Sequence, residues 1–85
     1  MSRYSVVFSK RAEKDLEKLP SHVVQKIVPV VVAFGDNPRP VGCKKLKGYE
    51  NLWRVRVGNY RIIYSIDDAV LVVDVRELGD RKDIY

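Results

Sequence analysis

The 85-residue sequence contains one cysteine, one histidine, one methionine and no long apolar run. A single cysteine, Cys43, excludes an internal disulfide and any metal site built from several cysteines. A single histidine, His22, likewise leaves no histidine-based metal cluster. The lone cysteine and the lack of a signal-peptide pattern point to a cytoplasmic protein that does not use a membrane. We therefore expect neither a metal ion nor another cofactor.

The whole chain has a net charge of +5, and acidic residues are scarce in its middle. Residues 39–66 contain seven lysines and arginines but one acidic residue, whereas residues 67–85 contain three basic and six acidic residues. Such a concentrated cationic patch favours nucleic acid over a membrane or a metabolite as the partner. The length fits one small domain over residues 1–85, without repeats or linkers.

The stretch 52–64 alternates polar and apolar residues on both sides of Gly58-Asn59. This pattern predicts a β-hairpin closed by a two-residue turn that tolerates positive φ. Side chains alternate between the two faces of a sheet, so one face is apolar and the other carries Arg54, Arg56 and Arg61. The turn sets a register with these facing pairs: Val57–Tyr60, Arg56–Arg61, Val55–Ile62 and Trp53–Tyr64.

Arg56 and Arg61 are thus predicted to face each other directly. Like charges in this position destabilise a strand pair by an amount comparable to the ~0.2–1 kcal/mol that a favourable pair contributes. A sequence selected for folding alone has little reason to keep such a pair, so we infer an anionic ligand on this face. The alternative is a solvated polar face whose cations spread into water.

Three lysines precede the hairpin, at Lys44, Lys45 and Lys47. A solvated loop or a short edge segment would explain them without a ligand. Because they adjoin the arginines in the sequence, we assign them to the same basic surface.

The N-terminal half predicts one strand and two helices. Tyr4, Val6 and Phe8 alternate along a strand over residues 4–8. Ser9 is a good N-cap for a helix over residues 10–19, which Pro20 ends. Residues 23–34 are rich in valine, which also suits a strand, but their length and periodicity favour a second helix.

This second helix is expected to be capped by Ser21, kinked at Pro29 and ended by Gly35, before a rigid loop over residues 36–40. Its apolar stripe is predicted to consist of Val24, Ile27, Val28, Val31 and Phe34.

After the hairpin, Asp68-Ala69 predicts a two-residue turn into a last strand over residues 70–78. Arg56, Arg61 and Arg76 then form a row across three strands, with Asp74 as the nearest partner on that face. The expected facing pairs are Ile66–Leu71, Tyr64–Val73, Ile62–Val75 and Arg61–Arg76.

Together these elements predict a small α+β domain of the order β-α-α-β-β-β, with two N-terminal helices packed on one face of an antiparallel sheet. Residues 79–85 form a tail that leaves the end of the sheet and is positioned to fold over the basic face.

This order resembles the RelE/ParE superfamily of toxin–antitoxin toxins, and within it the RelE-like mRNA interferases. The resemblance implies a ribosome-dependent endoribonuclease that cuts mRNA in the ribosomal A site, with ribosome and mRNA as partners. It also implies a cognate RelB-like antitoxin protein. It covers essentially the whole chain and rests on five segments: Ser9–Leu16, Asn37–Pro40, Lys45–Gly48, Leu52–Tyr64 and Gly79–Tyr85.

The resemblance also implies site residues. Many relatives carry lysines where this chain has Arg54 and Arg56, and histidine where it has Asp80. RNA or ribosome binding is assigned to Lys44, Lys45, Lys47, Arg76 and Lys82. The positions that match the family's catalytic residues are Arg54, Arg56, Arg61, Arg81 and Tyr85.

RNA cleavage of this type resembles other metal-free ribonuclease reactions, in which the 2′-OH attacks the adjacent phosphate. Arg61 and Arg81 suit stabilisation of the developing negative charge, because a guanidinium binds phosphate oxygens in bidentate geometry. Arginine stays protonated and is a poor general base. Tyr85 is expected to stack on a base or to join proton transfer, and Asp80 is the other candidate for proton transfer.

Two other functions stay open. One is a ParE-like toxin that inhibits DNA gyrase without RNA chemistry. The other is a non-catalytic nucleic-acid-binding module, which would show steep salt dependence and no cleavage.

Overall fold

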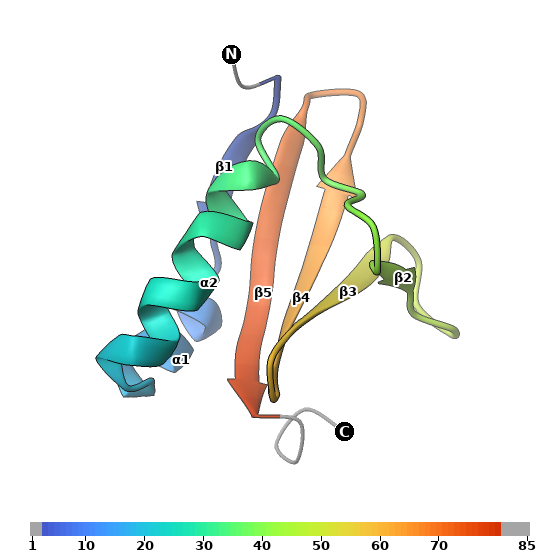
Figure 1. The fold of residues 1–85 in the computed structure, drawn as a ribbon. Coiled ribbons are helices and arrows are strands. Elements are labelled where there is room, and N and C mark those ends of the chain that lie inside the picture. Colours follow the sequence, from blue (N-terminus) through green and yellow to red (C-terminus); the bar gives the residue numbers. More distant parts are fainter. Residues whose placement is uncertain (1–2, 81–85) are drawn as a thin grey trace.

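The computed structural model describes residues 3–80, which form two helices and a five-stranded sheet (Figure 1). The predicted α+β domain is confirmed, with one additional short strand. The elements are β1 (Ser5–Phe8), α1 (Lys10–Lys18), α2 (Ser21–Ala33), β2 (Lys44–Lys45), β3 (Leu52–Val57), β4 (Tyr60–Asp67) and β5 (Val72–Asp80).

The sheet is mixed, with the strand order β1-β5-β4-β3-β2. β1 runs parallel to β5, whereas the other neighbours are antiparallel. The expectation of an antiparallel sheet was wrong for β1. Its partner is the last strand of the sequence, and local patterns carry no information on a pairing between such distant segments.

Hydrogen bonds connect α1 and its N-cap to β5. The Ser9 hydroxyl accepts from the Ala12 amide at 3.1 Å, which confirms the predicted cap, and donates to the Arg76 carbonyl at 2.9 Å. Asp15 Oδ2 accepts from the Leu78 amide at 3.1 Å. These bonds satisfy backbone groups of β5 beyond the end of β1 and fix the last residues of β5.

The second predicted helix is confirmed, and it continues through Pro29. Pro20 is its N-cap and makes no side-chain bond, so the predicted cap at Ser21 was wrong. The predicted stripe was also partly wrong, since Val28 is 41% exposed and Val24 is half-buried. Valines surround most of this helix, so periodicity alone does not select the buried side. The buried residues are Val23, Ile27, Val31 and Phe34.

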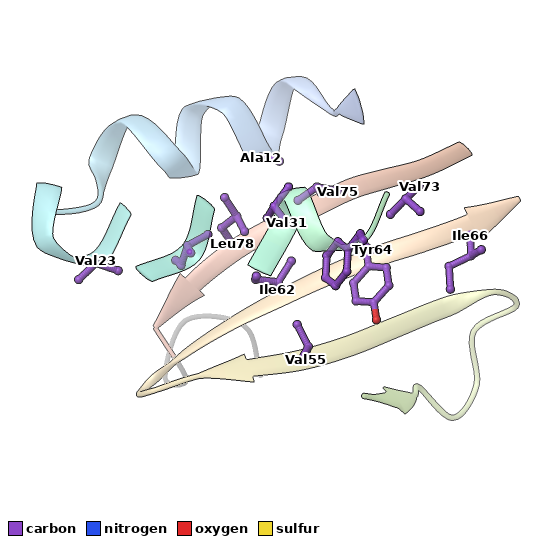
Figure 2. Packing of buried hydrophobic residues seen from close by; sticks show 12 residues of the cluster. Ala12, Val23, Val31, Val55, Ile62, Tyr64, Ile66, Val73, Val75 and Leu78 are labelled. Carbon is purple, nitrogen blue, oxygen red and sulfur yellow. The ribbon is translucent and has the colours of Figure 1, made fainter. Parts of the chain in front are cut away.

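Side chains of both helices meet one face of the sheet in a single apolar core (Figure 2). The fully buried Tyr64 stacks on Phe34, with 4.2 Å between the ring centres, and its hydroxyl donates to the Pro38 carbonyl at 2.8 Å. Burial raises the pKa of the Tyr64 phenol well above its ordinary value, so the group stays a protonated donor. No helix in residues 3–80 is long and apolar enough to cross a bilayer.

The predicted register of the β3–β4 hairpin is confirmed at all four facing pairs. Gly58 adopts φ +60°, the left-handed conformation that such a two-residue turn requires. Alternation and a short turn together determined this part of the sheet.

The predicted register of the last strand was wrong. Asp67 Oδ1 accepts from the amides of Ala69 and Val70, at 3.0 and 3.2 Å, so the turn spans residues 68–71 and β5 starts two residues later than predicted. A bulge opposite Ile63 and Tyr64 leaves Arg76 as the extra residue, so the predicted arginine row does not form. The observed pairs are Ile66–Val73, Tyr64–Val75, Ile62–Leu78 and Arg61–Gly79.

Asp68, in this turn, bonds to two distant segments. Arg39 Nη2 donates to its Oδ2 at 2.9 Å, and the Tyr4 hydroxyl donates to its Oδ1 at 2.6 Å. These donors, Arg39 first, hold the pKa of the Asp68 carboxyl below its ordinary value. A carboxyl whose pKa is lower in the folded than in the unfolded chain stabilises the fold above the unfolded pKa, about 3.9, and loses this contribution as pH falls through the folded pKa.

We therefore expect Asp68→Asn to lower the melting temperature at neutral pH, with a difference from wild type that shrinks below about pH 4. Thermal unfolding followed by circular dichroism across this range measures the effect. Asp36→Asn, at an exposed aspartate that makes no ion pair with residues 3–80, is the control. A difference independent of pH would contradict the assigned role of Asp68.

Candidate functional site on the outer face of the sheet

The three arginines of the hairpin lie on the sheet face opposite the helices. Arg54 and Arg56 flank the buried Val55 on β3, and Arg61 precedes the buried Ile62 on β4. Arg56 faces Arg61 as predicted. We call Arg54, Arg56 and Arg61 the arginine cluster.

Two members of the arginine cluster are shielded from solvent. Arg54 and Arg61 are each 6% exposed, whereas Arg56 is exposed. Ile63, which faces Arg54 across the strands, is also buried although it lies outside the main core. Alternation along the strands identified this face but not its burial. In a shielded position less water screens a guanidinium, so its attraction to an anion is stronger.

The side chain of Arg54 makes no hydrogen bond or ion pair with any other residue between 3 and 80. Two acidic residues of β5 are engaged elsewhere: Glu77 lies 3.9 Å from Arg11, and Asp74 lies 3.0 Å from Arg76. A buried charge is costly without a counter-charge, and arginine does not lose its proton to avoid the cost. Residues 3–80 thus provide no acidic partner for the Arg54 side chain, and an anionic ligand on this face stays a prediction.

The lysines before the hairpin are divided between the two faces. Lys44 faces Arg54 and therefore extends the outer face to the edge of the sheet, whereas Lys45 faces Trp53 and lies on the other side. Lys47 follows in the loop, and all three lysines are exposed. β2 is the short edge segment that the sequence left open. The role of these lysines in RNA binding stays a prediction.

Asp80 and Arg76 lie apart from the arginine cluster. Asp80 faces Tyr60 on β4, and by register it is on the helix side of the sheet. There it lines a hollow of about 380 Å³ together with Asp15. Arg76 is exposed at the bulge and pairs with Asp74, the partner that the sequence predicted. Proton transfer by Asp80 and RNA binding by Arg76 stay predictions.

The predicted tail residues Arg81, Lys82 and Tyr85 lie outside the described residues, and their roles also stay predictions. Gly79 and Asp80, which the sequence assigned to the tail, belong to β5. Within residues 3–80, histidine, cysteine and acidic side chains form no group of three that could hold a metal ion.

Comparisons with known proteins indicate the family to which the chain belongs. The family model of the ParE toxin of type II toxin–antitoxin systems (parDE) matches residues 6–85. The chain is 34% identical over 84 residues to Toxin RelE3 of Methanocaldococcus jannaschii, covering 94% of this chain and 93% of that protein. It is 29% identical over 86 residues to the mRNA interferase toxin RelE of Escherichia coli, covering 96% and 90%.

The fold agrees as well. The archaeal RelE–RelB complex from Pyrococcus horikoshii OT3 contains a chain that matches with a TM-score of 0.83 at 28% identity, covering 95% of this chain and 98% of that one. Fold and sequence thus indicate one class of protein, the toxins of toxin–antitoxin modules. The chain belongs to the RelE/ParE superfamily of these toxins and is of the RelE type, as the resemblance predicted.

Proposed function

We propose that this toxin is a ribosome-dependent endoribonuclease that cleaves mRNA in the ribosomal A site and thereby inhibits translation in the cytoplasm. The observation that carries the proposal is the arginine cluster, in which Arg56 faces Arg61 beside the shielded Arg54. Guanidinium groups on neighbouring strands suit a ligand with several closely spaced negative charges, such as an RNA backbone. The name of the E. coli relative, mRNA interferase, supports this choice.

In the proposed reaction the 2′-OH attacks the adjacent phosphate in line and the 5′-oxygen leaves, without a metal ion. Negative charge grows on the non-bridging oxygens in the transition state, where preorganised donors have their largest effect. Arg61 is proposed to bind these oxygens together with Arg81. Arg54 and Arg56 hold the flanking backbone or share the same charge.

The reaction also needs a group that removes the proton of the 2′-OH and a group that protonates the leaving 5′-oxygen. Arginine serves neither purpose well. We assign proton transfer to Tyr85, whose phenol would be acidified by neighbouring cations, with Asp80 as the second candidate. Tyr64 is unsuitable, because it is fully buried and its hydroxyl is bonded to the Pro38 carbonyl.

The partners follow from the same proposal. The outer face offers charged side chains on β3 and β4, and the ribosome would orient the mRNA over the arginine cluster. The P. horikoshii relative was solved as a complex with RelB. We propose that a RelB-like antitoxin covers the cationic face with an extended or helical segment and so blocks access of RNA.

A second candidate function has one observation in its favour. The family model that matches residues 6–85 is named for the ParE toxin of parDE. A ParE-like toxin would inhibit DNA gyrase and would leave RNA intact. A binding module without catalysis would also leave RNA intact and would bind with a steep dependence on salt.

The decisive experiment maps mRNA cleavage by primer extension, with purified protein alone and with programmed ribosomes. We expect cuts within the A-site codon only when ribosomes are present. Arg81→Ala and Tyr85→Phe are each expected to abolish these cuts while the protein still folds. Absence of cuts in both reactions would contradict the proposal, and a supercoiling assay would then distinguish gyrase inhibition from simple binding.

A further inference from the structure

The loop between β2 and β3 carries an aromatic side chain that the core does not use. Tyr49 is 61% exposed. The loop, residues 46–51, projects beyond the edge of the sheet on the side away from both helices (Figure 1). The Tyr49 hydroxyl makes no hydrogen bond with any other residue between 3 and 80.

Hydrogen bonds close this loop and tie its last residue to β4. The Leu46 amide donates to the Leu52 carbonyl at 2.8 Å and closes the base of the loop. Asn51 has φ +60°, and its side-chain amide donates to the Ile66 carbonyl on β4. Gly48, with φ +81°, takes a conformation that side chains rarely adopt. Tyr49 is therefore presented to solvent from a loop whose two ends are held by hydrogen bonds.

The surroundings of Tyr49 are basic. Lys44, Lys45 and Lys47 are exposed within five residues of it, and Glu50 is the one acidic residue of the loop. Lys44 also faces Arg54, so the lysines before this loop extend toward the arginine cluster. An exposed ring with cations beside it is the combination that binds an unpaired base and its flanking phosphates.

The loop lies some way along β3 from Arg56, which belongs to the proposed cleavage site. Leu52, where the loop ends, precedes Arg56 by four positions on β3. At a rise of about 3.3 Å per residue this is roughly 13 Å. One phosphate cannot contact both ends of such a span, so a base held by Tyr49 belongs to a nucleotide outside the cleavage position.

We propose that Tyr49 is a base-stacking residue: its ring binds an unpaired RNA base whose phosphates contact Lys44 and Lys47. The inference rests on the proposed function, since it assigns an RNA subsite to the same toxin. The base comes either from the mRNA or from an unpaired segment of ribosomal RNA. Stacking needs the ring and not the hydroxyl, which gives the proposal a specific test.

The test compares Tyr49→Ala with Tyr49→Phe. Val70→Ala is the matched control, because Val70 is 65% exposed and belongs to the β4–β5 turn rather than to the loop that carries Tyr49. Affinity is measured for a short single-stranded RNA containing a fluorescent base, for unprogrammed ribosomes and for programmed ribosomes. We expect Tyr49→Ala to weaken binding by about 5- to 100-fold, with Tyr49→Phe close to wild type.

The two sources of the base give different patterns. A loss on isolated RNA and on programmed ribosomes identifies an mRNA base, whereas a loss on ribosomes with or without mRNA, but not on isolated RNA, identifies ribosomal RNA. Unchanged affinity of Tyr49→Ala in all three measurements overturns the inference. Equal losses for Tyr49→Ala and Tyr49→Phe overturn it as well, because they indicate a hydrogen bond from the hydroxyl.

Failure of this inference is distinguishable from failure of the proposed function. If wild-type protein cleaves mRNA and Tyr49→Ala binds normally, the stacking assignment is wrong and the nuclease assignment stands. If wild-type protein cleaves nothing while Tyr49→Ala loses affinity and Tyr49→Phe keeps it, the stacking site stands without the nuclease.

Discussion

Arg61→Ala is expected to lower the rate of A-site cleavage on programmed ribosomes by about 10²- to 10³-fold, the usual effect of removing one donor to a developing oxyanion. Arg61 combines two properties that make the effect large. It faces Arg56 directly, and it is 6% exposed, so little water can replace its charge. Single-turnover cleavage, with the toxin in excess over ribosomes, measures the chemical step separately from binding.

Two further variants separate catalysis from folding. Arg61→Lys keeps a positive charge but loses bidentate geometry, so we expect a rate between those of wild type and Arg61→Ala. Lys10→Ala, at an exposed position on α1, is expected to cleave like wild type. Melting temperatures of all the variants show whether any loss follows unfolding. Cleavage by Arg61→Ala within twofold of wild type would remove Arg61 from the proposed mechanism.

The arginine cluster was predictable because the hairpin is a local structure. Gly58-Asn59 indicated a two-residue turn. With this turn in place, the alternation of polar and apolar residues determined every facing pair between Trp53 and Tyr64. The burial of Arg54 and Arg61 was not predictable, since a strand pattern indicates which face a side chain occupies and not what surrounds it.

The predicted register of the last strand was wrong for a physical reason that the sequence shows only weakly. The Asp67 carboxylate accepts two turn amides and so stabilises a longer turn than the two-residue one that was predicted. The bulge near Arg76 shifted the register again. The longer turn and the bulge are both local features, but each shifts every following residue of β5 relative to β4.

Contacts between distant segments could not be predicted at all. Asp68 bonds to Arg39 and to Tyr4, and the Arg39 guanidinium lies 5.0 Å from the centre of the Trp53 ring. None of these residues has a sequence pattern that indicates its partners. The parallel pairing of β1 with β5 belongs to the same category.

The α2 stripe gives the sharpest contrast between sequence and structure, because the pattern placed Ile27 and Val28 together in the core. Ile27 is fully buried, so Ile27→Ala is expected to lower the free energy of unfolding by about 2–5 kcal/mol. In a domain of this size each kcal/mol lowers the melting temperature by about 4–8 °C. Urea unfolding at neutral pH and thermal melting both measure the change.

Val28→Ala is the matched control on the adjacent position of the same helix. Val28 is 41% exposed, so its truncation is expected to change stability by less than about 0.5 kcal/mol. Alanine also has the higher helix propensity, which offsets part of any loss in both variants. Equal destabilisation by the two substitutions would mean that Val28 is covered in solution, and would restore the stripe that the sequence predicted.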